Sequence, residues 1–174
     1  MKMSKSCGRG YGEQELIRLL LGTTIISSKK LKSAFTNVED YFMWQNETSL
    51  DDTSKALANS MGISDTVATE LNLANQEGKP LMFPAFMYGV LIDIRTYNPG
   101  QQPKVKSRRG VPAGLIIPFD TWRDTPKSRW TFICAGEKDM AVARSNGLNA
   151  ITITGGENAL PISVSEFKGR NVAI

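Results

Sequence analysis

Hydrophobic and polar positions change their spacing near residue 79, and this change divides the chain into a helical part and a mixed part. Before that point, apolar residues recur three to four positions apart, a spacing typical of amphipathic helices. The pattern predicts helices over residues 13–21, 31–44, 51–62 and 63–74, with Ser64 capping the last of them. The last two helices are expected to form a small hairpin, a motif that serves either nucleic-acid contact or plain core packing.

Beyond residue 79, the apolar positions fall in short runs bounded by glycine and proline, a pattern that favours strands. Strands are predicted over residues 81–86 and 89–97, and a turn at Asn98-Pro-Gly100 follows them. The basic stretch after the turn, residues 104–109, is predicted as either a strand or a loop.

From Trp130 onward the pattern predicts a β-α-β unit, with strands over 131–134 and 150–154 and a helix over 137–145. So short a connection implies parallel strands with a right-handed crossover. The last residues resemble the opening of a third buried strand, so we expect the chain to be a truncated part of a longer protein. The expected fold class is α/β, or α+β overall. It comprises a helical N-terminal segment (1–78), a small basic β-rich lobe (79–129) and a partial Rossmann-like β-α-β domain (130–174).

Composition restricts the chemistry that the chain can perform. Of the 174 residues, 41% are hydrophobic and 22% charged, as in soluble globular proteins, and no apolar run approaches the ~20 residues of a membrane helix. Two distant cysteines give no disulfide framework, which favours the cytoplasm. The absence of histidine excludes His-based general base catalysis and directs any metal hypothesis towards carboxylates and a hard ion.

The net charge of +4 is unevenly distributed, because residues 95–129 carry eight Lys or Arg against two Asp, a local charge of +6. Such a strip can neutralise phosphates, although a solvated loop is the alternative. Lys104, Lys106 and Arg108 would share one face if this stretch is a strand, since side chains alternate along a strand. The candidate nucleic-acid-binding residues are Arg95, Lys104, Lys106, Arg108 and Arg109.

Acidic and glycine residues follow both strands of the expected β-α-β unit, at 135–139 and 155–158. Ligands of open α/β sheets bind at the carboxyl ends of the strands. Carboxylates at such turns are suitable ligands for Mg²⁺. The alternative is that these acidic residues complement the dipole of the helix that they begin.

The segment ICAGEKDMAVARSNG at 133–147, followed by NAITITGG at 149–156, resembles the first half of a TOPRIM domain. That fold occurs in bacterial and phage primases, in type IA and type II topoisomerases and in recombination-associated nucleases. The family pattern is a strand, Glu-Gly-x-x-Asp opening a helix, a second strand ending in Gly, and a third strand with Asp-x-Asp. Here Asp139 matches the motif's Asp, the family's Glu falls on Ala135, and Glu137 stands two residues later.

The resemblance therefore implies Glu137 and Asp139 as candidate catalytic residues and Asp139 as the metal ligand. The Asp-x-Asp pair is expected beyond Ile174. Because the pair is missing and position 135 is Ala, the chain by itself is expected to be inactive.

A weaker resemblance extends upstream, over 57–63, 84–95 and the basic stretch to Pro118. These segments are similar to the region between the zinc module and TOPRIM in phage and plasmid primases. There, a Pro-led strand, a Gly turn and an apolar strand ending in Arg form the basic lobe of the polymerase core. Cys7-Gly-Arg-Gly10 is similar to the last knuckle of a primase zinc ribbon, but position 4 is Ser, so zinc is not expected in this chain.

The resemblance implies that the parent protein is a DNA primase of a phage, plasmid or other mobile element. Such an enzyme is a nucleotidyltransferase that makes RNA primers on single-stranded DNA with Mg²⁺ or Mn²⁺. The implied partners are single-stranded DNA, nucleotides and a replicative helicase, with no membrane. One alternative is a TOPRIM nuclease or topoisomerase, which would lack the upstream Pro-strand-Gly-strand-Arg region. The other is a degenerate TOPRIM protein that serves as a DNA-binding or scaffolding module, an interpretation that Ala135 favours.

Overall fold

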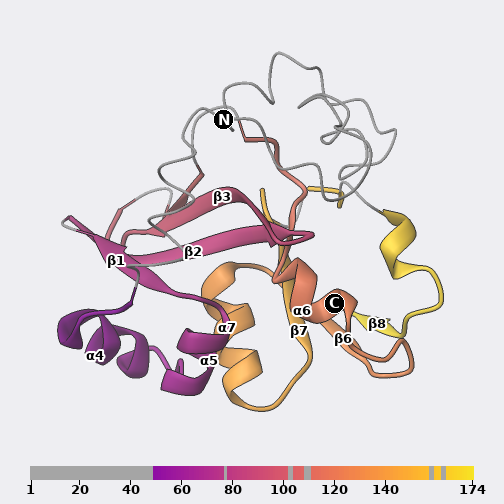
Figure 1. The fold of residues 1–174 in the computed structure, drawn as a ribbon, viewed down its shortest axis with the longest axis horizontal. Coiled ribbons are helices and arrows are strands. Elements are labelled where there is room, and N and C mark those ends of the chain that lie inside the picture. Colours follow the sequence, from indigo (N-terminus) through magenta and orange to yellow (C-terminus); the bar gives the residue numbers. More distant parts are fainter. Residues whose placement is uncertain (1–48, 77, 102–103, 108–110, 157–158, 162–163) are drawn as a thin grey trace, which may run out of the picture.

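The computed structural model describes residues 49–76, 78–101, 104–107, 111–156, 159–161 and 164–174. The predicted helices over 13–21 and 31–44, together with Cys7, Arg108 and Arg109, lie outside the described residues. The described chain forms two four-stranded sheets with helices packed against them, so the expected mixed α/β class is confirmed (Figure 1).

The first sheet is antiparallel and has the strand order β1-β2-β3-β4. It contains the predicted hairpin. Its strands are β1 (Ala74–Gln76), β2 (Lys79–Met87), β3 (Val90–Tyr97) and β4 (Val105–Lys106). Within residues 104–107, the part of the basic stretch that the structure describes, the strand covers Val105–Lys106 at the edge of this sheet.

The second sheet has the order β5-β7-β6-β8 and contains the predicted β-α-β unit. Its strands are β5 (Ile116–Ile117), β6 (Thr131–Cys134), β7 (Ala150–Ile153) and β8 (Val172–Ala173). Strand β6 pairs in parallel with both β7 and β8, and β5 pairs antiparallel with β7. The expected parallel strands and the expected third strand near the end of the chain are therefore confirmed.

The helices of the described residues are α4 (Asp52–Ser60), α5 (Asp65–Glu70), α6 (Phe119–Arg123) and α7 (Glu137–Ser145). Ser64 caps α5 as predicted, because its side chain accepts a hydrogen bond from the backbone N–H of Val67. The prediction of helix as far as residue 74 is wrong at its end. Asn72 has a φ of 51°, which ends the helical path, and Ala74 begins β1.

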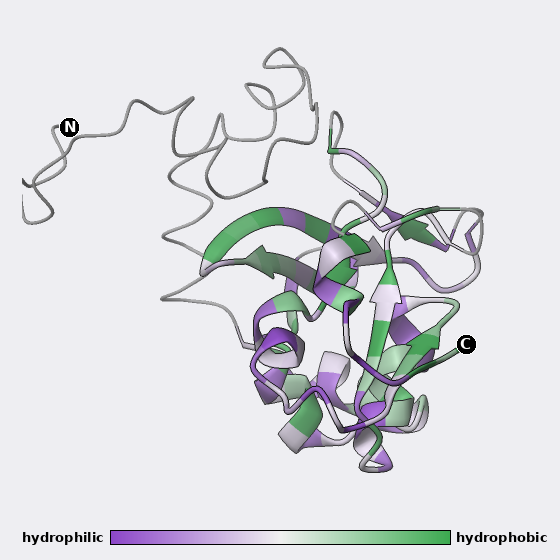
Figure 2. Ribbon diagram, turned by 90° about the vertical axis from the view of Figure 1, so that its right-hand side faces the viewer, coloured by the Kyte–Doolittle hydropathy of each residue, from purple (hydrophilic) through white to green (hydrophobic). Residues whose placement is uncertain are grey.

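One cluster of buried side chains extends through the helical hairpin, both sheets and α7. Ile63, Phe83 and Met140 belong to it, although they come from the three different segments expected from the sequence. The change from helix to strand near residue 79 is therefore no break in the packing. Figure 2 shows hydrophobic residues along the strands in the middle of the molecule, with hydrophilic residues mostly on the helices and turns around them.

The turn after β7 depends on two glycines with left-handed backbone conformations. Gly155 has a φ of 97° and Gly156 a φ of 75°. A Cβ added at Gly155 would lie 2.7 Å from the Cβ of Ala113 and 2.9 Å from that of Ala159, whereas one at Gly156 would meet nothing within 4 Å. Close packing between this turn and the segment before β5 therefore requires glycine at position 155.

We predict that Gly155→Ala destabilises the fold by about 3 kcal/mol, because it combines left-handed strain with a steric clash. Gly156→Ala is the matched control and should cost about 1 kcal/mol, since it introduces the strain alone. Denaturant unfolding of the two variants measures the difference. Equal losses of stability would contradict the close approach at Gly155.

Candidate functional site

A cleft of about 650 Å³ lies at the carboxyl ends of β6 and β7, where the sequence placed the ligand-binding edge of the sheet. Its walls come from both sheets: the end of β3 and the region of β4 on one side, and the turns after β6 and β7 on the other. The lining residues are Arg95, Val105, Lys106, Ser107, Ala135, Gly136, Glu137, Ile153, Gly155 and Gly156. The cleft thus gathers several candidate residues that lie far apart in the sequence.

Arg95 and Glu137 form a buried ion pair in the wall of this cleft. Arg95 Nε donates to Glu137 Oε1 over 2.6 Å, and the two residues are only 9% and 3% exposed. Arg95 Nη1 also donates to Ser107 Oγ and lies 4.0 Å from Asp93 Oδ2. The predicted phosphate-binding arginine and the predicted catalytic glutamate therefore neutralise each other.

Glu137 is favoured in this position by the helix that it begins. It is the first residue of α7, and Gly136 is the N-cap, with an extended backbone and no side chain. A carboxylate in the first turn of a helix is stabilised by the positive end of the helix dipole. The local sequence thus sets the glutamate at the start of the helix, and Arg95 on the facing sheet supplies the counter-charge.

Lys106 is the exposed cation of the cleft wall on β4, and its Nζ lies 3.3 Å from Gln101 Oε1. Lys104, which is also exposed, directly precedes this strand. Its carbonyl accepts a hydrogen bond of 2.7 Å from the backbone N–H of Asn98, which holds the start of the basic stretch against the turn after β3. Two of the predicted phosphate-binding lysines are therefore accessible to solvent.

Ala135 and Asp139 lie at the start of α7, but they differ in their relation to the cleft. Ala135 is exposed and lines the cleft, so a methyl group stands at the position where the resemblance led us to expect a glutamate. Asp139 is exposed on the first turn of α7. Burial raises the pKa of the Cys134 thiol, and the nearby negative charge of Asp139 raises that pKa further. Asp139 therefore lies close enough to Cys134 for its charge to act on the thiol.

The carboxylates of the site do not gather into a metal centre. Within the described residues, no group of three or more Cys, Asp or Glu is arranged to hold a metal ion. Glu137 is occupied by Arg95, and Asp139 is a lone exposed carboxylate on its turn. Because Mg²⁺ prefers several oxygen ligands in octahedral geometry, this arrangement does not fit a complete Mg²⁺ site.

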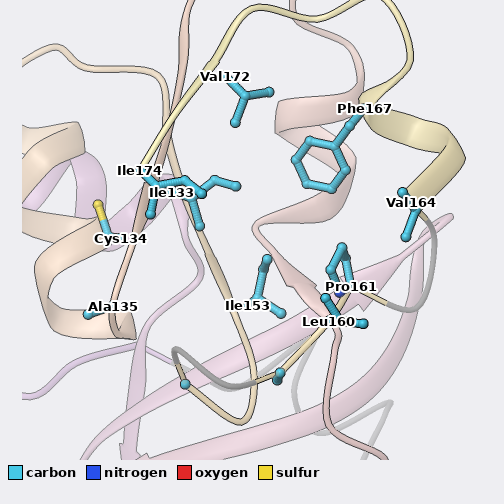
Figure 3. A pocket seen from close by; sticks show the side chains of 12 residues that line it. Ile133, Cys134, Ala135, Ile153, Leu160, Pro161, Val164, Phe167, Val172 and Ile174 are labelled. Atoms are coloured by element: carbon cyan, nitrogen blue, oxygen red, sulfur yellow. The ribbon is translucent and has the colours of Figure 1, made fainter.

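A second hollow, an apolar groove of about 720 Å³, lies at the same sheet (Figure 3). It adjoins the first cleft, because Ala135, Ile153 and Gly156 line both. It runs between the strands of the second sheet and the short 3-10 helix η1 (Val164–Phe167). Its described lining contains no charged side chain and includes Ile133, Ile153, Leu160, Phe167, Val172 and Ile174. A phosphate or a metal ion would find no counter-charge there, so the cleft beside Lys106 is the better candidate site.

No helix in the described part of the chain is both long and apolar enough to cross a membrane.

No protein-family model matches this chain, and no curated protein matches it in sequence. The interpretation of the site therefore rests on its residues and their geometry.

From this geometry we predict that the chain binds Mg²⁺ with an affinity no tighter than millimolar. The described residues of the site offer a single exposed carboxylate, that of Asp139, which cannot replace the waters that Mg²⁺ holds. Isothermal titration calorimetry of the purified chain with MgCl₂ measures this affinity, with Asp139→Asn as the comparison. Micromolar binding that disappears in Asp139→Asn would mean that the carboxylate site is more complete than its geometry indicates.

Proposed function

We propose that this chain is part of a TOPRIM-type DNA primase of a phage or plasmid, and that its cleft holds the backbone of single-stranded DNA. The observation that carries the proposal is the composition of the cleft. The carboxyl edge of a parallel β-α-β unit, with its Gly-Glu-Lys-Asp turn at 136–139, faces Lys106 of the basic stretch. In the primases that the sequence resembles, a basic lobe likewise precedes the TOPRIM β-α-β unit along the chain.

The basic stretch supplies the attraction for the nucleic acid. Lys104 and Lys106 are exposed, so their ammonium groups can neutralise phosphates and release the counterions condensed on the strand. Tyr97, at the end of β3, is buried, so it does not offer the stacking face that some single-strand-binding proteins use. Binding should therefore be mainly electrostatic and indifferent to base sequence.

A second candidate function, a DNA-binding or scaffolding module without catalysis, is favoured by the start of α7. Position 135 carries a methyl group, and Glu137 is engaged with Arg95, so neither residue offers a free general base. In primases, divalent metal neutralises the triphosphate and activates the attacking hydroxyl, but the described carboxylates do not fit such a site. The two candidates share DNA binding and differ in the chemistry of the parent protein. The coding sequence after Ile174 distinguishes them, since an Asp-x-Asp motif there would favour the primase.

Binding of a fluorescein-labelled oligo-dT strand, followed by anisotropy over a salt series, tests the shared function. If Lys104, Lys106, Arg108 and Arg109 each neutralise one phosphate, log K should fall with log salt with a slope of roughly −3, at about 0.7 per contact. Replacing Lys106 and Arg108 together by Ala should reduce the magnitude of the slope by about 1 to 2 units.

Lys55→Ala is the matched control for this experiment. Lys55 is an exposed lysine on α4, paired with Asp52 at 4.0 Å, and it does not line the cleft. It should leave the slope unchanged. An affinity that does not depend on salt would contradict phosphate binding by the basic stretch. So would equal effects of the Lys55 and Lys106 substitutions on the slope.

The purified chain should synthesise no primer on single-stranded DNA with either Mg²⁺ or Mn²⁺. The reason is that Ala135 replaces the expected glutamate and the 174 residues contain no Asp-x-Asp. The measurement is incorporation of radiolabelled nucleotides into short products, separated on a denaturing gel. Template-dependent dinucleotide formation by this chain, retained after repurification, would refute the prediction.

A further inference from the structure

The guanidinium of Arg95 lines the cleft but is already occupied by groups of the protein itself. Its Nε donates to Glu137 Oε1 over 2.6 Å, and its Nη1 donates to Ser107 Oγ. The same Nη1 lies farther, at 4.0 Å, from the buried carboxylate of Asp93. The side chain is 11% exposed, and that of Glu137 is 4% exposed. The cleft therefore contains a second cation, beside Lys106, whose charge is neutralised from within.

A carboxylate and a phosphate can bind the same donors of a guanidinium. Both are anions with oxygen acceptors that match the planar fork of arginine donors, and both form charge-assisted hydrogen bonds with it. The Glu137 carboxylate, fixed at the start of α7, thus takes the place at Arg95 that a phosphate in the cleft would otherwise take.

We propose that Glu137 sets the affinity of the cleft for polyanions, because its carboxylate holds Arg95 and withholds it from phosphate. This inference rests on the proposed nucleic-acid-binding function of the cleft and assigns Glu137 a role that limits binding. In the wild-type complex the pair stays closed, and the phosphates are held by the exposed lysines. When the pair is broken, Arg95 keeps only the more distant carboxylate of Asp93, at 4.0 Å, and its Nε becomes available for one additional phosphate contact.

Glu137→Gln is the direct test, because the amide keeps the size of the side chain and removes its charge. Oligo-dT should bind this variant about tenfold more tightly at low salt, as expected for one added charge-assisted contact. The slope of log K against log salt should become steeper by about 0.7. Asp65→Asn is the matched control: it removes the same charge from the first turn of another helix, α5, at an exposed position that does not line the cleft. It should change the affinity by less than about twofold and leave the slope unchanged.

Two further variants keep the test informative if Glu137→Gln proves unstable in a thermal melt. Glu137→Asp conserves the net charge, but its shorter side chain draws back from Arg95. Any gain in affinity then comes from the released guanidinium and not from a lost negative charge. The double variant Arg95→Gln with Glu137→Gln removes both members of the pair and leaves Asp93 as the buried carboxylate next to position 95. It should lose the gain that Glu137→Gln shows.

Tripolyphosphate serves as a second probe and separates the inference from the function on which it rests. If the chain binds neither oligo-dT nor tripolyphosphate, the proposed function and the inference both fail. If it binds tripolyphosphate but not oligo-dT, the DNA function fails, and the gain in Glu137→Gln still decides the role of Glu137. The inference is overturned if Glu137→Gln binds no more tightly than Asp65→Asn, or if the double variant keeps the gain.

Discussion

Two charges buried at the junction of the sheets set the shape of the candidate site. Arg95 lies at the end of β3 and Glu137 at the start of α7, so the bond between them connects the antiparallel sheet to the β-α-β unit. Leaving either group buried without its partner would be costly, because the desolvated charge would have no compensation. The pair therefore favours one relative arrangement of the two walls, and the cleft between β4 and the turns after β6 and β7 follows from that arrangement.

The same pair explains why position 135 can be an alanine. Ala135 and Gly156 line both the charged cleft and the apolar groove beside it. A carboxylate at position 135 would lie near a groove whose described lining has no charge and a cleft whose arginine already serves Glu137. It would have Lys106 as its available cation, and that lysine is exposed to water. A small apolar side chain at position 135 avoids a second carboxylate beside Glu137, one that would have no buried partner.

The parts of the fold that the sequence predicted well are those encoded by contiguous residues. The strands around α7 are short apolar runs bounded by glycine, and Gly136 and Gly147 mark the limits of the helix. Strand β5 and helix α6 were missed because two and five residues are too few to show a period, and they adjoin a charged stretch. Strand β1 was missed because Leu71 and Ala74 continue the helical spacing of the preceding segment, and only the positive φ of Asn72 separates the two elements.

The candidate site was predicted residue by residue, but its internal bonds were not. From the sequence, Arg95 is a basic residue that ends an apolar run, and Glu137 is an acidic residue at the start of a predicted helix. Each is compatible with a solvent-exposed functional group. Their pairing joins positions 42 residues apart, and nothing in the local pattern of either segment indicates it. Long-range ion pairs arise from the packing of whole sheets, in which the apolar residues decide which polar ends meet. A charged residue that the sequence predicts to bind a ligand, such as Arg95, can therefore already be neutralised by another part of the chain. Whether it is available to a ligand depends on the fold.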